Sequence, residues 1–92
     1  MANTYYRFMM QEAKDYIQNH EYYDGTTKGA VAEMLNTGRK IDKLFSQGNK
    51  KAIMRISEDN ENYTAAEQRC ADLALYDLES QEEEQRERIT NF

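Results

Sequence analysis

The chain has 92 residues and a mass of 10.8 kDa, with four glycines, one cysteine and no proline. A chain of this length supports one small domain, which we place over residues 1–92. Its formal charge of −5 divides unevenly: residues 1–57 hold nine Lys or Arg and six Asp or Glu (+3), whereas residues 58–92 hold three and eleven (−8). No apolar run is long enough to cross a membrane. The start, MANTYYRFMM, lacks the pattern of a signal peptide, so we expect a cytoplasmic protein.

The first predicted helix runs from about Thr4 to His20. Asn3 or Thr4 can cap it, because either side chain can accept a hydrogen bond from a backbone N–H of the first turn. Apolar and aromatic residues recur every three or four positions and predict one buried stripe: Tyr6, Met9, Met10, Ala13, Tyr16 and Ile17. Asp24 and Gly25 then indicate a turn.

A second helix is expected from Thr26 or Thr27 to Gly48, where glycine favours a helix end. Gly38 leaves two alternatives, because glycine weakens a helix interior. Either the helix continues through it, or residues 36–38 form a turn between two shorter helices. The apolar positions at roughly helical spacing are Val31, Met34, Leu35, Ile41, Leu44 and Phe45.

The segment KKAIMRIS, residues 50–57, is too short for periodicity to separate a helix from a strand. We favour a helix, because the chain has no second β-rich run that could pair with a strand. A polar connector, SEDNENY, follows it.

The last predicted helix begins at Thr64, because Thr64 and Glu67 fit a capping box. Its expected buried face consists of Ala66, Cys70, Leu73, Ala74 and Asp77, widened by Leu75, Tyr76 and Leu78. Every residue from 80 to 88 is polar, so we expect residues 80–92 to extend from the domain or to fray. The sequence therefore predicts an all-α domain of three to four helices with a long acidic C-terminal helix.

The chain offers little for catalysis or metal binding. Its one histidine, His20, falls at a predicted helix end, where an imidazole suits the helix dipole. Cys70 falls on an apolar helix face, which is typical of a structural thiol, and a lone cysteine excludes an internal disulfide. The acidic residues 58–62 lack the glycine and glutamate spacing of a calcium-binding loop. We therefore expect no catalytic residue, no metal, no cofactor and no enzymatic activity.

A basic segment suggests one alternative function. Residues 31–48, VAEMLNTGRKIDKLFSQG, resemble a helix-turn-helix, although their apolar spacing is one residue shorter than that of the motif. The resemblance implies that Arg39, Lys40 and Lys43 contact nucleic acid. An ordinary amphipathic helix with solvated lysines is the other interpretation.

A second alternative rests on the start of the same helix. Thr26, Thr27 and Lys28 could bind a phosphate through exposed backbone N–H groups, and Tyr22 and Tyr23 could stack on a base. Such a site would suit a nucleotide-sequestering protein.

Tyrosines are concentrated near the N-terminus, with five of the seven in the first 23 residues. Tyrosine provides a large contact area with a polar end, which suits protein interfaces. We expect Tyr5, Phe8, Tyr22 or Tyr23 to be partly exposed, and we expect the three tyrosines to contact a partner. Packing over the rest of the core is an equally good explanation, and self-association as a homodimer or larger homo-oligomer would fit either one.

The acidic C-terminal helix is the strongest functional signal. Carboxylates spaced along a rigid helix can imitate the phosphates of a nucleic acid and occupy a site built to hold one. The residues expected to bind a basic, nucleic-acid-binding protein in this way are Asp72, Asp77, Glu79, Glu82, Glu83, Glu84 and Glu87. A solvated helix face is the alternative.

In size, composition and charge, the chain resembles the small, acidic, proline-free helical proteins of bacteriophages and mobile elements. These include anti-CRISPR and other anti-defence proteins, which often occupy the nucleic-acid channel of a defence nuclease. The resemblance implies a non-catalytic inhibitor that acts in the bacterial host cytoplasm. It carries over no individual residue.

Overall fold

A computed structural model describes residues 3–19 and 25–90, except for the side chains of residues 25–27 and 84–90. The described chain forms four α-helices and no strand: α1 (Thr4–Gln18), α2 (Gly25–Ser46), α3 (Lys50–Glu58) and α4 (Ala65–Thr90). The predicted all-α class with a long acidic C-terminal helix is confirmed. Residues 50–57 are helical, as favoured over a strand, and α2 continues through Gly38 without a turn.

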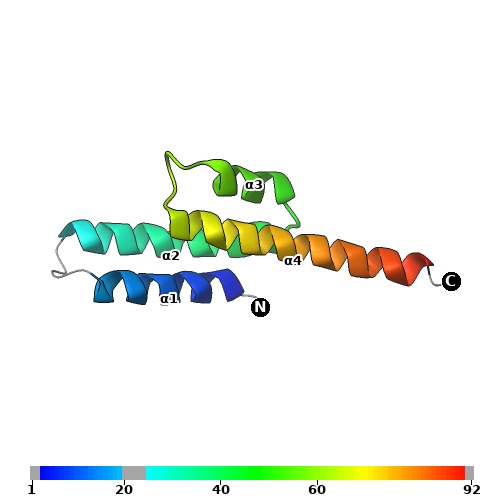
Figure 1. Ribbon diagram of the computed structural model, residues 1–92, viewed down its shortest axis with the longest axis horizontal. Coiled ribbons are helices and arrows are strands. Elements are labelled where there is room, and N and C mark those ends of the chain that lie inside the picture. Colours follow the sequence, from blue (N-terminus) through cyan, green and yellow to red (C-terminus); the bar gives the residue numbers. More distant parts are fainter. Residues whose placement is uncertain (1–2, 20–24, 91–92) are drawn as a thin grey trace.

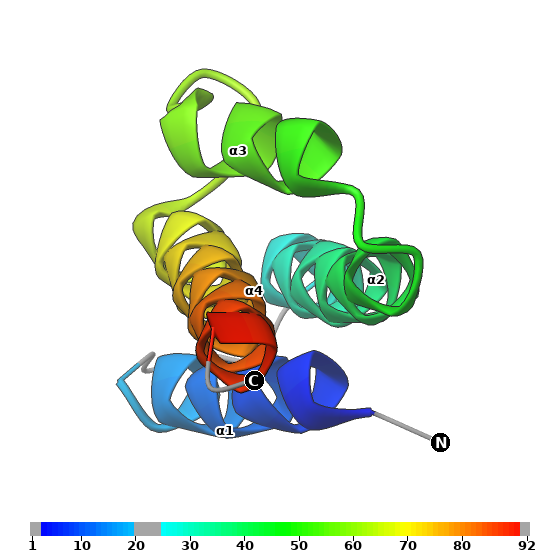
Figure 2. The same ribbon diagram turned by 90° about the vertical axis from the view of Figure 1, so that its right-hand side faces the viewer.

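Two helices, α2 and α4, lie side by side in the middle of the molecule (Figure 1). Viewed along the long axis, α1 covers one side of this pair and the short α3 covers the other (Figure 2). The C-terminal part of α4 extends past the other three helices, and the molecule measures 59 Å along its axis against 24 and 19 Å across. This arrangement leaves one side of α4 facing solvent along its length.

The core receives one fully buried large side chain from each helix: Met9, Ile41, Ile53 and Cys70. The other buried apolar residues are Tyr5, Ala13, Met34, Ile56, Ala71, Ala74 and Leu78. The predicted burial of Cys70 is confirmed. The buried stripe of α1 begins at Tyr5, one residue earlier than predicted, and continues through Met9 and Ala13. Tyr6 is only half-buried, and Met10 is exposed.

Gly38 allows α1 and α2 to approach each other closely. A Cβ at this position would lie 2.9 Å from the Cα of Tyr6 and 3.0 Å from both the carbonyl oxygen of Tyr5 and the Cγ of Met9. Only glycine fits such a contact without moving the neighbouring backbone. Gly38 therefore does not interrupt α2, and its lack of a side chain sets the distance between α1 and α2.

The N-terminus of α1 is capped by another helix and not by its own residues. Of the two residues predicted as possible caps, Asn3 and Thr4, Asn3 occupies the cap position, but its side chain makes no capping hydrogen bond. Instead, Asp42 of α2 accepts the backbone N–H groups of Tyr5 and Tyr6 on its two carboxylate oxygens, each at 2.9 Å. The first turn of α1 is thereby attached to the C-terminal part of α2.

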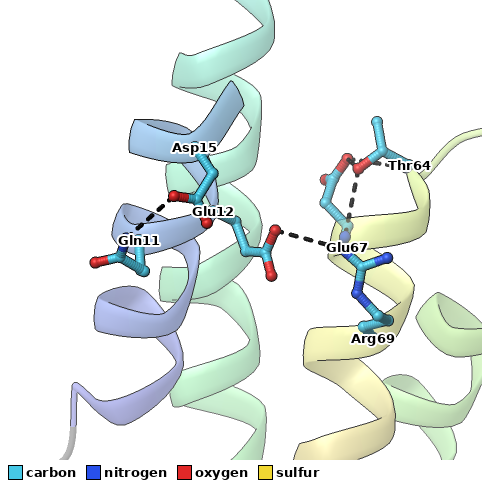
Figure 3. A network of polar contacts seen from close by, with 6 residues as sticks. All are labelled: Gln11, Glu12, Asp15, Thr64, Glu67 and Arg69. Carbon is cyan, nitrogen blue, oxygen red and sulfur yellow. Dashed lines mark hydrogen bonds and ion pairs between the residues drawn. The ribbon is translucent and has the colours of Figure 1, made fainter. Parts of the chain in front are cut away.

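Two other helix ends follow short-range rules. Gly48, with a φ of 67°, ends α2: its N–H donates to the carbonyl of Phe45, and the next N–H donates to Leu44. At the start of α4, Thr64 and Glu67 form the predicted capping box (Figure 3). Glu67 is buried, and its second carboxylate oxygen accepts the hydroxyl of Thr37.

Candidate functional site

The solvent-facing side of α4 carries several of the acidic residues predicted to bind a partner. Asp72, Glu79 and Glu83 are exposed and are separated by seven and four positions, so they share one side of the helix with Tyr76. Together with Leu73, we call these residues the outer face of α4. None of the three carboxylates makes a hydrogen bond or ion pair with another described side chain.

The other predicted acidic residues do not all belong to this face. Glu82 is exposed, but its carboxylate pairs with the Nζ of Lys50 of α3 at 3.3 Å. Asp77 is half-buried and accepts the hydroxyl of Tyr5 at 2.5 Å, so it connects α4 to α1. The side chains of the remaining two, Glu84 and Glu87, lie outside the described part of the chain.

Beside the outer face, a shallow groove of about 520 Å³ lies between α1 and α4. The residues that line this α1–α4 groove are Phe8, Glu12, Arg69, Asp72, Leu73 and Tyr76. Its apolar surface comes from Phe8 of α1, which is half-buried, and from two exposed side chains of α4. Leu73 is 43% exposed and Tyr76 is 68% exposed, so the groove presents a small apolar surface to solvent.

The exposure of Leu73 and Tyr76 corrects the sequence prediction, which placed both on the buried side of the last helix. The side of α4 that faces the core carries mainly small residues, Cys70, Ala71 and Ala74, which let the neighbouring helices approach closely. Leu78 also lies on this side and is buried, whereas Leu73 and Tyr76 fall outside it. The sequence does contain a signal for this orientation, namely small residues at helical spacing. They indicate which side of a helix packs closely on its neighbours better than hydrophobicity does.

Two of the residues that line the groove form an ion pair between α1 and α4. The Nη2 of Arg69 lies 3.3 Å from the Oε2 of Glu12 (Figure 3). The Arg69 side chain is 59% exposed, so the pair contributes little to stability. Its effect on the groove is to hold the guanidinium of Arg69 toward α1.

Tyr5 is 3% exposed, which contradicts the prediction that it presents a surface to a partner. Its ring packs on Phe45 with centroids 5.1 Å apart, and its hydroxyl donates to Asp77. The pKa of the Tyr5 phenol is raised, mainly by burial and to a smaller extent by this hydrogen bond. The other two tyrosines predicted to bind a partner, Tyr22 and Tyr23, lie outside the described residues, as does His20.

The predicted basic residues lie on the exposed side of α2. Arg39, Lys40 and Lys43 are all exposed. The guanidinium of Arg39 lies 4.8 Å from the ring centre of Tyr6, and Lys40 donates to the hydroxyl of Tyr63 at 3.1 Å. Two of these three cations, Arg39 and Lys40, are thus paired with aromatic residues.

The helix-turn-helix resemblance fails, because residues 25–46 form one helix. The motif needs a turn near residues 36–38, and Thr37 and Gly38 are instead buried within α2, where they pack toward α4 and α1. Of the three residues considered for phosphate binding, Lys28 is exposed. The side chains of Thr26 and Thr27 are not described.

The buried polar groups of the described chain serve packing. Burial raises the pKa of the Cys70 thiol to about 12, and the charge of Asp42 adds to the effect, so this cysteine is not a nucleophile in the folded protein. Among the side chains that the structure describes, no three from His, Cys, Asp or Glu converge as a metal site would require. None of the described helices combines the length and hydrophobicity needed to cross a bilayer.

Comparison of the chain with protein-family models, with curated proteins and with solved structures finds no match. Functional inference therefore rests on the surface of the molecule itself.

Proposed function

We propose that this protein is a non-catalytic inhibitor that binds a basic, nucleic-acid-binding protein through the outer face of α4. Its size and charge resemble those of anti-defence proteins, so the proposed target is a nuclease of a bacterial defence system, such as a CRISPR effector. On this proposal, the gene is carried by a phage or mobile element.

The observation that carries the proposal is the position of the carboxylates on α4. Asp72, Glu79 and Glu83 are exposed on a helix whose end extends beyond the other three helices (Figure 1). Four residues of helix advance about 6 Å, and two nucleotide steps of a duplex strand advance about 7 Å. Carboxylates four positions apart, such as Glu79 and Glu83, can therefore meet cations arranged to hold every second phosphate of a strand.

The electrostatics favour the same side of the molecule. Arg39, Lys40 and Lys43 lie on the exposed side of α2, whereas the exposed carboxylates of the outer face lie on α4. A molecule with one acidic side approaches a basic partner in a preferred orientation, and long-range attraction speeds the encounter at low salt.

A capture experiment with matched charge variants tests the proposal. The protein is immobilised and exposed to nucleic-acid-binding proteins that a heparin column has enriched from a bacterial host lysate. We expect the wild type to retain a basic protein and Glu79→Lys/Glu83→Lys to lose it. Glu58→Lys/Glu61→Lys changes the net charge equally at exposed positions outside α4, and it should retain the partner. Equal retention by both double variants at about 0.15 M salt would refute the proposal.

Direct nucleic-acid binding is the second candidate, and the exposure of Arg39, Lys40 and Lys43 on one side of α2 favours it. On this account, the protein shifts a labelled duplex or single strand in a gel at low salt. Replacing the three cations with glutamine should abolish the shift. The absence of any shift for the wild type would remove this candidate.

A further inference from the structure

The α1–α4 groove exposes an aromatic ring between carboxylates. Tyr76 is 68% exposed, the highest value among the large hydrophobic residues that remain at the surface of the described chain. Asp72 lies four positions before Tyr76 and Glu79 three positions after it, so both carboxylates neighbour the ring on the helix surface. Among the described residues, no cation and no second ring lies over Tyr76.

This combination matches the chemistry of a guanidinium. A cation is attracted to the face of a tyrosine ring, and a planar guanidinium can stack there while its N–H groups donate to a carboxylate. The protein already contains one such contact, because Arg39 lies 4.8 Å from the ring centre of Tyr6. Tyr76 offers the same ring chemistry on α4, without a cation from the described part of its own chain.

The groove's own arginine does not fill this position. Arg69 donates to Glu12 of α1 at 3.3 Å, at the end of the groove away from Tyr76 along α4. That pairing leaves Asp72 as the lining carboxylate without an ion-pair partner among the described side chains. Phe8 and Leu73 provide the apolar surface on which the methylene groups of an arginine can pack.

We propose that the α1–α4 groove binds an arginine side chain of the protein partner. Its guanidinium stacks on Tyr76 and donates to Asp72, and its aliphatic part lies on Leu73. This inference rests on the proposed function and specifies it: the partner must present an arginine, and not only a diffuse positive charge, beside the region that receives the acidic end of α4. Lysine would fill the position less well, because an ammonium cannot stack or donate in a planar fork.

Nuclear magnetic resonance titration with octa-arginine and octa-lysine tests the inference. At about 0.15 M salt, we expect octa-arginine to bind the wild type at least about threefold more tightly than octa-lysine. The backbone amide shifts should be largest around residues 8–12 and 69–76. Equal affinities for the two peptides, undetectable binding of octa-arginine, or shifts confined to residues 79–90 would overturn the inference.

Three variants locate the interaction. Tyr76→Leu keeps an apolar side chain but lacks the ring, so it should bind the two peptides equally. Tyr76→Phe keeps the ring and should retain the preference for arginine. Asp72→Asn should weaken octa-arginine binding by about threefold. A preference that persists in Tyr76→Leu would contradict the assignment, provided that its thermal unfolding matches that of the wild type.

The capture experiment separates this inference from the proposed function. If Tyr76→Leu retains the captured partner as well as the wild type does and Glu79→Lys/Glu83→Lys loses it, the arginine site is wrong and the proposed function stands. If Glu79→Lys/Glu83→Lys retains the partner, the proposed function is wrong.

Discussion

The carboxylate of Asp42, near the end of α2, accepts the backbone N–H of Tyr5 at 2.9 Å, thirty-seven positions away in the chain. Its other oxygen accepts the N–H of Tyr6 at the same distance. A buried carboxylate at the start of a helix satisfies two donors that the helix itself leaves unpaired and interacts favourably with the helix dipole. Through this contact, the position of α1 depends on α2.

Asp42→Ala should lower the free energy of unfolding by about 3 kcal/mol, because two backbone N–H groups in the first turn of α1 lose their acceptor. Urea unfolding followed by circular dichroism measures the effect. Asn3→Ala is the matched control, since Asn3 precedes the same helix but makes no capping bond. It should change stability by less than about 0.5 kcal/mol. Equal effects of the two variants would show that Asp42 is not the cap.

Gly38→Ala should destabilise the protein by about 1–3 kcal/mol, although alanine is the better helix former. The added methyl would lie 2.9 Å from the Cα of Tyr6, so α1 has to move. Gly29 lies in the same helix, and a methyl group added there would meet no atom within 4 Å. Gly29→Ala should therefore stabilise the protein by about 0.5–1 kcal/mol. Opposite shifts in the midpoint of urea unfolding are expected, and a gain in stability for Gly38→Ala would contradict the close contact.

The buried phenol of Tyr5 should make stability fall at alkaline pH. Its pKa lies above the ordinary value of 10.0, mainly because of burial and secondly because of the hydrogen bond to Asp77. The unfolded chain therefore releases this proton at lower pH than the folded protein does. The contribution is fully present below about pH 10 and is lost as the pH rises above that value.

Unfolding in urea at about pH 8 and about pH 10.5 measures the loss. In Tyr5→Phe, the fall in stability between these two pH values should be smaller than in the wild type. Its stability near pH 8 should be lower by about 1.5 kcal/mol, because the hydrogen bond to Asp77 is lost. Tyr76→Phe removes an exposed tyrosine and should keep the wild-type pH dependence. Identical pH dependence in all three proteins would argue against a buried Tyr5.

Cys70 should resist thiol reagents until the protein unfolds. Its pKa is raised to about 12 by burial and by the charge of Asp42, and a thiol, unlike a thiolate, is a poor nucleophile. We expect labelling by a disulfide reagent at about pH 8 to be roughly a hundredfold slower in buffer than in urea. Rapid labelling in buffer would place Cys70 at the surface.

Local features of the fold were predictable, because neighbouring residues determine them. The capping box of Thr64 and Glu67, the end of α2 at Gly48 and the helical state of residues 50–57 belong to this class. The cap from Asp42 was not predictable in this way. The cap depends on where α1 meets α2, which neighbouring residues do not determine. In the sequence, Asp42 lies between Lys40 and Lys43, a pattern that is typical of a surface residue.

The candidate site was predictable only in part. Exposure of Asp72, Glu79 and Glu83 follows from their charge. The exchange of roles between Tyr5, which is buried, and Tyr76, which is exposed, depends on which side of each helix faces the bundle. Small residues on α4 and a glycine on α2 determine this orientation, because they allow the helices to pack closely. Hydrophobic periodicity alone does not predict which side of each helix faces the core.

The central claim is that α4 occupies the nucleic-acid site of its partner, and a displacement assay tests it most directly. The captured partner is bound to a fluorescent duplex, and the protein is added while anisotropy is recorded. We predict that the wild type releases the duplex and that Glu79→Lys/Glu83→Lys does not, whereas Glu58→Lys/Glu61→Lys acts as the wild type does. A ternary complex, in which the partner holds the protein and the duplex together at full anisotropy, would contradict the account.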